Sequence, residues 1–185
     1  MALCARLQRF FDERRIGYEI WSHPESFTAS SVATGMGLEG HRVAKVVVVQ
    51  GSRREALMAV LTARCRLDLD ALALVAGTGP LGLAPEHELA ALFPDCETGA
   101  MPPFGNLYGL PVFVSACIPR SGPLAFESGN HHEVVRLGYA EFDRLVRPVV
   151  GEFCRHAAPV GARREARGPA EREPTAAPEL VTPRG

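Results

Sequence analysis

The sequence predicts a single α+β domain built on a mixed, largely antiparallel β-sheet flanked by helices. Its 185 residues, of which 46% are hydrophobic, supply enough apolar surface for one compact core. Runs of β-branched residues typical of strands alternate along the chain with segments whose apolar residues recur at helical spacing. Residues 157–185 are rich in Pro, Ala, Arg and Glu and almost lack large apolar residues. We therefore expect a domain over residues 1–156 and a disordered tail over 157–185.

The N-terminal elements are expected to be a helix and a strand. Apolar residues recur at helical spacing from Leu3 to Phe11, and YEIWS then alternates as a strand does. Ser26 or Thr28 is suited to cap a short helix over residues 29–36. The apolar runs RVAKVVVVQG and EALMAVLTA follow, and the polar turn GSRR between them predicts a central β-hairpin.

The second half of the domain continues with helices and short strands. Residues 67–75 and 85–93 have a helical pattern, and each has an acidic residue near its N-terminal end, where the helix dipole favours negative charge. PVFVSACI, PLAFESG and HEVVRLGY have the composition of short strands. Residues 142–154 are expected to form the last helix, which Pro148 kinks or starts.

Charge, hydropathy and cysteine content argue against several classes of protein. The formal net charge of -1 means that a polyanion must be held by a local basic patch. No apolar run approaches the roughly 20 residues that span a bilayer, so we expect a cytosolic protein without a membrane partner. Scattered cysteines, odd in number and without a Cys-x-x-Cys pair, favour reduced, buried thiols over a disulfide or zinc framework. They are Cys4, Cys65, Cys96, Cys117 and Cys154.

Lysine usage directs attention to one residue. Nineteen of the twenty basic residues are Arg, and the only lysine is Lys45, inside the apolar strand RVAKVVVVQ. A compact ammonium fits a pocket or contacts one carbonyl where a planar guanidinium does not, so Lys45 is a candidate for catalysis. The alternative is a strand lysine that faces water on the same side as Val43 and Val47.

The segment GAMPPFGNLYGLP, residues 99–111, predicts a stiff, shaped loop. Its two adjacent prolines have no backbone N–H to donate. The donors left free for a ligand are then the amides of Gly99, Ala100, Met101, Phe104 and Gly105. Such amides can polarise an ester carbonyl and hold the oxyanion that forms during hydrolysis. An ordered connection between a helix and a strand is the alternative.

Together these features resemble the YbaK-type aminoacyl-tRNA deacylases, the family of editing domains associated with prolyl-tRNA synthetase. The strand VAKVVVV is similar to the family strand that carries an essential lysine, and residues 99–105 fit its G-x-x-x-P-x-G loop. The turn at residues 128–131 resembles a later small-residue turn of the family. The resemblance covers roughly residues 1–155 and implies a partly barrel-like sheet. It also implies hydrolysis without a metal, a cofactor or a covalent intermediate.

The resemblance assigns catalysis to Lys45, Gly99 and Ala100. Residues expected to bind the aminoacyl end are Phe27, Met101, Pro103, Phe104, Gly105, Asn106, Ser128, Gly129, Asn130 and His131. The apolar side chains among them, at positions 27, 101 and 104, are the expected walls that select amino acids by size.

Two positions depart from the family pattern, and the competing motifs are weak. Ser115 stands where relatives often carry an aspartate, and Asn130 stands where serine or threonine is usual. Residues 131–133, His-His-Glu, lack the i, i+4 spacing of a zinc helix, so no metal is expected there. The chain has no G-x-S-x-G elbow, P-loop or G-x-G-x-x-G fingerprint. His23 is placed to close a strand end near the pocket.

We therefore expect a trans-editing hydrolase that cleaves the ester bond of a mischarged aminoacyl-tRNA. Its substrate would be a small amino acid on a non-cognate tRNA such as prolyl tRNA, and its partner the 3' end of that aminoacyl-tRNA. An aminoacyl-tRNA synthetase is a further candidate partner. The alternative is a non-catalytic module of the same fold that binds a tRNA acceptor end or a synthetase.

Overall fold

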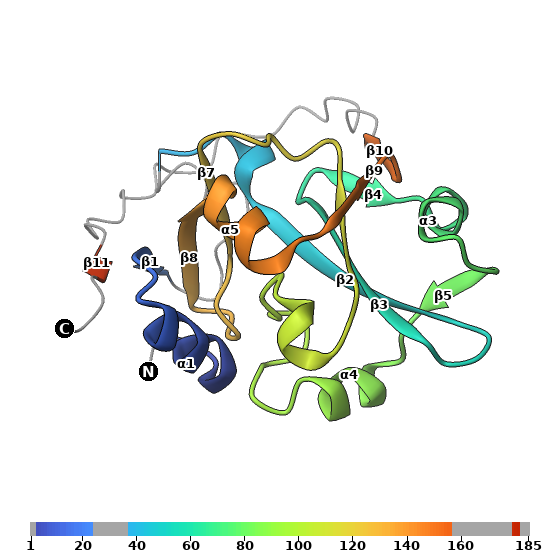
Figure 1. Ribbon diagram of the computed structural model, residues 1–185, viewed down its shortest axis with the longest axis horizontal. Coiled ribbons are helices and arrows are strands. Elements are labelled where there is room, and N and C mark those ends of the chain that lie inside the picture. The colour runs from blue at the N-terminus through green and yellow to red at the C-terminus, as the bar shows by residue number, and fades with distance from the viewer. Residues whose placement is uncertain (1–2, 24–36, 157–178, 182–185) are drawn as a thin grey trace, which may run out of the picture.

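The computed structural model describes residues 3–23, 37–156 and 179–181 (Figure 1). Its helices are α1 (Ala5–Arg14), α3 (Leu69–Ala76), α4 (Glu86–Leu92) and α5 (Tyr139–Val146), with the short 3-10 helices η1 (Gly40–Arg42) and η2 (Gly105–Tyr108). None of the helices in these ranges is long and apolar enough to cross a bilayer. The short helix expected over residues 29–36, with its caps Ser26 or Thr28, lies outside the described residues.

The larger sheet has the strand order β5-β2-β3-β6-β9. Its strands are β2 (Ala44–Gly51), β3 (Ala56–Thr62), β5 (Leu81–Leu83), β6 (Val112–Ser115) and β9 (Val149–Gly151). β2 and β3 form the predicted antiparallel hairpin, whereas β6 pairs in parallel with both β3 and β9. The prediction of a mixed sheet is thus confirmed. Nearly every residue of β3 is buried, which explains its continuous apolar sequence.

The second sheet has the order β11-β1-β8-β7 and is antiparallel throughout. Its strands are β1 (Tyr18–Ser22), β7 (Pro123–Glu127), β8 (Glu133–Gly138) and β11 (Glu179–Val181). β11 comes from the tail that was expected to be disordered, and the rest of that tail lies outside the described residues. Two further short strands, β4 (Cys65–Leu67) and β10 (Cys154–His156), pair with each other. The expected barrel does not close, because the two large sheets are joined only by an isolated parallel bridge between Val43 and Ala125 among the described residues.

The prediction of one helix over residues 142–154 is wrong after Val146. Arg147 adopts a left-handed conformation, with φ 51° and ψ 56°, and Pro148 follows it. A residue before proline is hindered from the helical region, and proline itself has no N–H for the helix ladder. The chain therefore leaves α5 as an extended segment and forms β9 and then β10.

The main core is formed by both large sheets together with α1 and α5. Phe11 of α1, Met58 of β3, Phe126 of β7 and Phe142 of α5 are all fully buried in it. Burial of each such side chain contributes roughly 1.5–3 kcal/mol to folding. The core thus holds the second sheet against the larger one and fixes how their strands approach each other.

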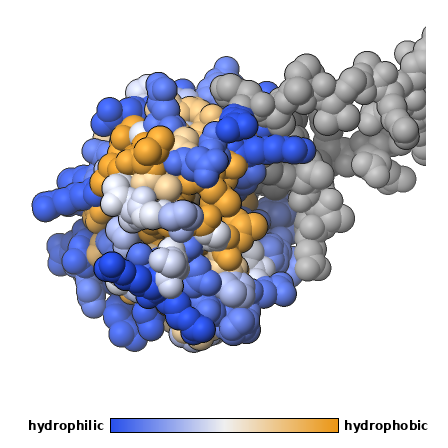
Figure 2. Space-filling view, turned by 90° about the vertical axis from the view of Figure 1, so that its right-hand side faces the viewer, coloured by the Kyte–Doolittle hydropathy of each residue, from blue (hydrophilic) through white to orange (hydrophobic). Residues whose placement is uncertain are grey.

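A second, smaller core lies on the other face of the larger sheet, under α3. Leu72 of α3 packs there with Leu57 and Ala59 of β3. α3 begins at an N-cap, Asp68, whose side chain accepts a hydrogen bond from the amide of Ala71, as expected for an acidic residue at this end. Figure 2 shows this side of the molecule, where apolar residues gather at the surface. Large apolar side chains that stay exposed are Leu74, Leu83 and Val149.

Candidate active site

A small pocket lies where the two large sheets separate. Val43, just before β2, and Ala125 of β7 pair in the isolated bridge, and after it β2 and β7 pair only within their own sheets. Its volume is about 190 Å³, below the roughly 300–1,000 Å³ of pockets for drug-sized ligands. It is lined by His23, Val43, Ala44, Lys45, Val46, Ala63, Gly99, Met101, Glu127 and Val134. A group the size of a small amino acid suits this space.

Lys45 lines this pocket from β2, where it lies opposite Leu61 of β3. Its side chain is half-buried, and it forms no hydrogen bond or ion pair within the described part of the chain. The alternating strand places it on the same face as Val43, whose side chain packs with Ala125 and Val134 of the other sheet. The ammonium group is therefore held at the pocket without a protein partner in these ranges.

The loop at residues 99–105 reaches the same pocket through Gly99 and Met101. Gly99 has φ +97°, a conformation that side chains rarely adopt. Its amide lies 3.2 Å from Met101 Sδ, a weak acceptor that a ligand oxygen can replace. The amide of Met101 makes no hydrogen bond within the described residues.

Two of the five backbone amides that were expected to be free already donate hydrogen bonds to nearby carbonyls of the chain. The amide of Ala100 donates to the carbonyl of Glu97 at 3.0 Å, and that of Phe104 donates to the carbonyl of Pro102 at 2.8 Å. Ala100 is also fully buried. The loop thus presents Gly99 and Met101 to the pocket, whereas Ala100 supports the turn behind them.

The later part of this loop turns away from the pocket. Phe104, expected as a pocket wall, is fully buried in the main core, where its ring contacts Phe11, Phe126 and Phe142. Large apolar rings gain most from burial, which explains this placement. Pro103 and Gly105 are buried, and Asn106 is exposed with its side-chain amide donating to Leu145 O. None of these residues lines the pocket, and Phe27 lies outside the described residues.

The turn at residues 128–131 lies beside the loop. Ser128 is fully buried, and its hydroxyl accepts a hydrogen bond from Asn130 Nδ2. Gly129 has φ +112° and packs against Cys4, where a Cβ would come within 2.6 Å of Cys4 Cβ. Gly129 and Asn130 line a separate hollow, so only His131 of this turn reaches the loop.

His131 joins the turn to the loop. Its Nε2 donates to the carbonyl of Thr98 at 3.1 Å, and its backbone amide donates to Glu97 Oε2 at 2.9 Å. The edge of its ring lies 3.4 Å from the position of a Cβ built on Gly99. The glycine thus leaves the space that the imidazole needs.

Glu127, a pocket residue that the sequence did not suggest, faces His131. Its Oε1 lies 3.6 Å from His131 Nδ1. Burial raises the pKa of Glu127 above its usual value, although the neighbouring His131 opposes that shift. Burial lowers the pKa of His131, but the hydrogen bond to Thr98 O and the charge of Glu127 outweigh it, so this pKa is raised.

His23 and Ser115 stand in different relations to this site. His23, at the end of β1, lines the pocket as anticipated, and its backbone amide donates to the carbonyl of His132. Ser115, the departure at the end of β6, is buried beside Cys117 and does not line the pocket. The missing aspartate therefore leaves the lining of this pocket unchanged.

Comparison with known proteins gives a family match and a fold match. Residues 23–145 match the profile of a family described as the aminoacyl-tRNA editing domain. No curated protein matches the chain. The matched range includes the pocket residues from β1 to β8.

Solved structures share the fold at low sequence identity. A proposed trans-editing enzyme for prolyl tRNA synthetase is 24% identical with a TM-score of 0.71, covering 81% of this chain and 95% of its own. A hypothetical protein is 16% identical with a TM-score of 0.71, covering 81% of this chain and 99% of its own. A proposed signal transduction protein from Marinobacter aquaeolei is 17% identical with a TM-score of 0.62, and the match covers 80% of this chain and 30% of that one.

Proposed function

Because this chain belongs to the aminoacyl-tRNA editing domain family, we propose that it hydrolyses the ester bond of a mischarged aminoacyl-tRNA in trans. The observation that carries the proposal is the meeting of Lys45, Gly99 and Met101 at one small pocket. These residues come from a strand and a loop that are distant in sequence. Their convergence supplies one cation and two backbone amides with weak or no acceptors in the described chain.

The pocket groups fit the charges of an aminoacyl ester. The ester carbonyl would lie against the amides of Gly99 and Met101, with the Lys45 ammonium near the same oxygen or a terminal phosphate. Water attacks the carbonyl carbon, the oxyanion is held by these donors, and the bond to the ribose oxygen breaks as that oxygen takes a proton. The neighbouring ribose hydroxyl orients the attacking water in this scheme, so positioning carries the reaction.

Glu127 adds a recognition element that we assign to the amino group of the substrate. Its carboxylate lines the same pocket as Lys45 but belongs to the other sheet. A free α-ammonium is the feature that distinguishes an aminoacyl ester from a peptidyl ester, and a carboxylate is its natural partner. Lys45 and Glu127 thus provide opposite charges for the two ends of the aminoacyl group.

Size selection fits a pocket of about 190 Å³. A hydrophobic wall at Met101 rejects bulky side chains, whereas alanine, cysteine, serine and threonine esters can enter. Such a second sieve removes amino acids smaller than the one that the tRNA should carry. The proposed substrate is a small amino acid on a non-cognate tRNA such as prolyl tRNA, and the proposed location is the cytoplasm.

The test is deacylation of tRNAs charged with alanine, cysteine, serine, threonine and proline, by the unaltered protein and by Lys45→Ala. We expect release of one or two small amino acids, and a loss of about 100-fold in kcat/KM in the variant. Because the Lys45 side chain has no partner in the described chain, the melting temperature of the Lys45→Ala variant should equal that of the unaltered protein. Arg53→Ala, which removes an exposed cation in the β2–β3 turn, is the matched control and should keep full activity.

Two outcomes contradict this assignment. If Lys45→Ala keeps full activity, the Lys45 ammonium has no role in the hydrolysis. Retained tRNA binding with no release from any of the five esters favours a non-catalytic module that binds a tRNA end or a synthetase. Lys45→Arg separates charge from shape, because a planar guanidinium keeps the charge but does not fit the position of a compact ammonium.

A further inference from the structure

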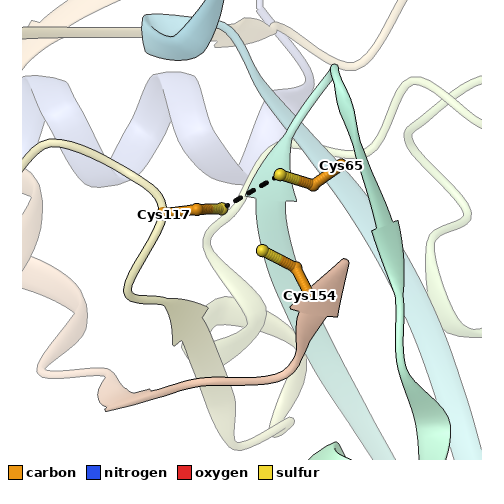
Figure 3. A group of neighbouring side chains, drawn as sticks. All are labelled: Cys65, Cys117 and Cys154. Atoms are coloured by element: carbon orange, nitrogen blue, oxygen red, sulfur yellow. Dashed lines mark hydrogen bonds between the residues drawn. The ribbon is translucent and has the colours of Figure 1, made fainter. Parts of the chain in front are cut away.

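Three cysteines that are far apart in sequence meet at one end of the larger sheet (Figure 3). Cys65 lies in β4, Cys154 in β10, and Cys117 in the turn after β6. β4 and β10 are paired strands, with Cys154 opposite Leu67, so two of the sulfurs come from one small sheet and the third from the turn that follows β6. All three Sγ atoms lie within 4.8 Å of one another, and those of Cys65 and Cys117 are 3.5 Å apart.

This spacing fits three ligands around one ion. A tetrahedral zinc site with Zn–S bonds of about 2.3 Å places its sulfurs roughly 3.8 Å apart. The three side chains point toward a common centre in Figure 3. A disulfide joins only two sulfurs, at about 2.05 Å, and leaves the third thiol unexplained. None of the five cysteines, all of which lie in the described residues, forms a disulfide in the structure.

One side-chain hydrogen bond reaches a sulfur of the group, and a second holds the turn that carries another. The hydroxyl of Thr62 donates to Cys65 Sγ at 3.2 Å, and Ser115 Oγ accepts from the backbone amide of Cys117 at 3.4 Å. Thr62 and Ser115 are both buried. Outer hydrogen bonds of this kind orient the ligands of metal sites and tune their affinity.

We propose that Cys65, Cys117 and Cys154 form a structural site for a thiophilic d10 cation, Zn²⁺ or Cu⁺. Three thiolates suit both ions, since soft sulfur ligands select Cu⁺ and zinc among the biological metals. Reduced, buried thiols were expected from the sequence, and the proposed site gives three of them a further role. Their sequence spacing gives no motif because each ligand comes from a different element.

The site ties β10 to the strands that carry the pocket. Cys65 follows Thr62 and Ala63 at the end of β3, and Ala63 lines the pocket while its amide donates to the carbonyl of Val43. A bound ion therefore fixes the end of β3 from outside the pocket, which none of the three cysteines lines. Its role is structural, and it is independent of the proposed deacylation.

The test uses the full chain, purified without a histidine tag and kept reduced under anaerobic conditions. Metal content by mass spectrometry should show one zinc or one copper ion per chain, and the ion found decides between them. Titration of the metal-free protein with Cd²⁺ should produce a thiolate-to-cadmium charge-transfer band that saturates at one equivalent. The bound ion should also protect three of the five thiols from alkylation.

Matched variants assign the site. Cys65→Ser, Cys117→Ser and Cys154→Ser should each lose the band, whereas Cys96→Ser, which removes a partly buried thiol elsewhere, should keep it. Thr62→Val leaves every ligand in place and should weaken binding about 10–100-fold. No retained metal and no band in the unaltered protein would overturn the proposal. So would a band that survives in all three cluster variants, or a Cys65–Cys117 disulfide in place of the ion.

Discussion

Glu127 and His131 form a contact between two titratable side chains at the candidate site. His131 already donates through Nε2 to Thr98 O, so a proton on Nδ1 faces the Glu127 carboxylate. Both groups have a raised pKa in the folded protein. A group whose pKa rises on folding contributes stability below its unfolded pKa and loses that contribution as the pH rises through its folded pKa.

The melting temperature should therefore respond to His131 in a defined pH window. Relative to His131→Gln, the unaltered protein should be stabilised at about pH 6, and this advantage should shrink toward pH 8 as the imidazole loses its proton. The effect should be small because both side chains are partly exposed and solvent screens them. Thermal unfolding across this range checks it.

The neighbouring His132 provides the matched control for that measurement. His132 is exposed and lies next in sequence, so His132→Gln should leave the pH profile of the melting temperature unchanged. An equal pH dependence in both variants would assign the effect to general charge and not to the Glu127–His131 pair.

Residue types alone could predict part of this site. Lys45 stands out because the chain has no other lysine, and Gly99 stands out because glycine and proline mark its loop. Glu127 could not be found in this way, since its place in the pocket depends on the pairing of Val43 with Ala125, which are far apart in the chain. Met101 was expected both as a wall and as a free amide donor, whereas the hydrogen bonds that occupy the amides of Ala100 and Phe104 are shown by no sequence pattern.

At the scale of elements, the loop from Thr98 to Gly105 depends on the backbone of Gly99. An alanine there must adopt φ +97° and brings a Cβ to 3.4 Å from the His131 ring. Strain of this kind costs about 1–3 kcal/mol. Gly99→Ala should lower the free energy of unfolding by that amount and displace His131 from Thr98, which denaturant titration and deacylation assays measure.

Gly79→Ala is the control for the loop. Gly79 has no positive φ and no atom within 4 Å of an added Cβ, so this variant should be nearly neutral. If Gly99→Ala is equally neutral, the loop does not need the conformation that glycine provides.

Elements with long patterns could be predicted, and short ones could not. The β2–β3 hairpin follows from two β-branched runs with a polar turn. β4, β5, β9 and β10 have three residues each, too few for alternation to appear. β9 was also hidden by its neighbour α5, because Pro148 was assigned to the inside of a helix that ends before it.

At the scale of the whole molecule, Phe104 joins two helices and the second sheet inside the main core. Its ring contacts α1 through Phe11, β7 through Phe126 and α5 through Phe142. Truncating a fully buried phenylalanine costs about 3–5 kcal/mol, so Phe104→Ala should lower the free energy of unfolding by this amount. Denaturant unfolding measures it.

Leu83→Ala is a suitable comparison because Leu83 is 65% exposed, and it should change stability by less than about 0.5 kcal/mol. If Phe104→Ala leaves the free energy of unfolding nearly unchanged but alters the amino-acid selectivity, Phe104 is a pocket wall and not a core residue.

The fold class follows from the order of helices and strands along the sequence. The division into two sheets does not, because it depends on which strands meet across the core.

The isolated bridge between Val43 and Ala125 makes the width of the pocket a property of the whole fold. Lys45 lies two residues after one end of the bridge and Glu127 two residues after the other, and each belongs to a separately hydrogen-bonded sheet. β2 and β7 diverge from this bridge, so the distance between the Lys45 ammonium and the Glu127 carboxylate depends on the angle between the two sheets. Core residues that never touch the ligand can thus tune which amino acid fits, and selectivity can evolve without any change in the residues that perform the chemistry.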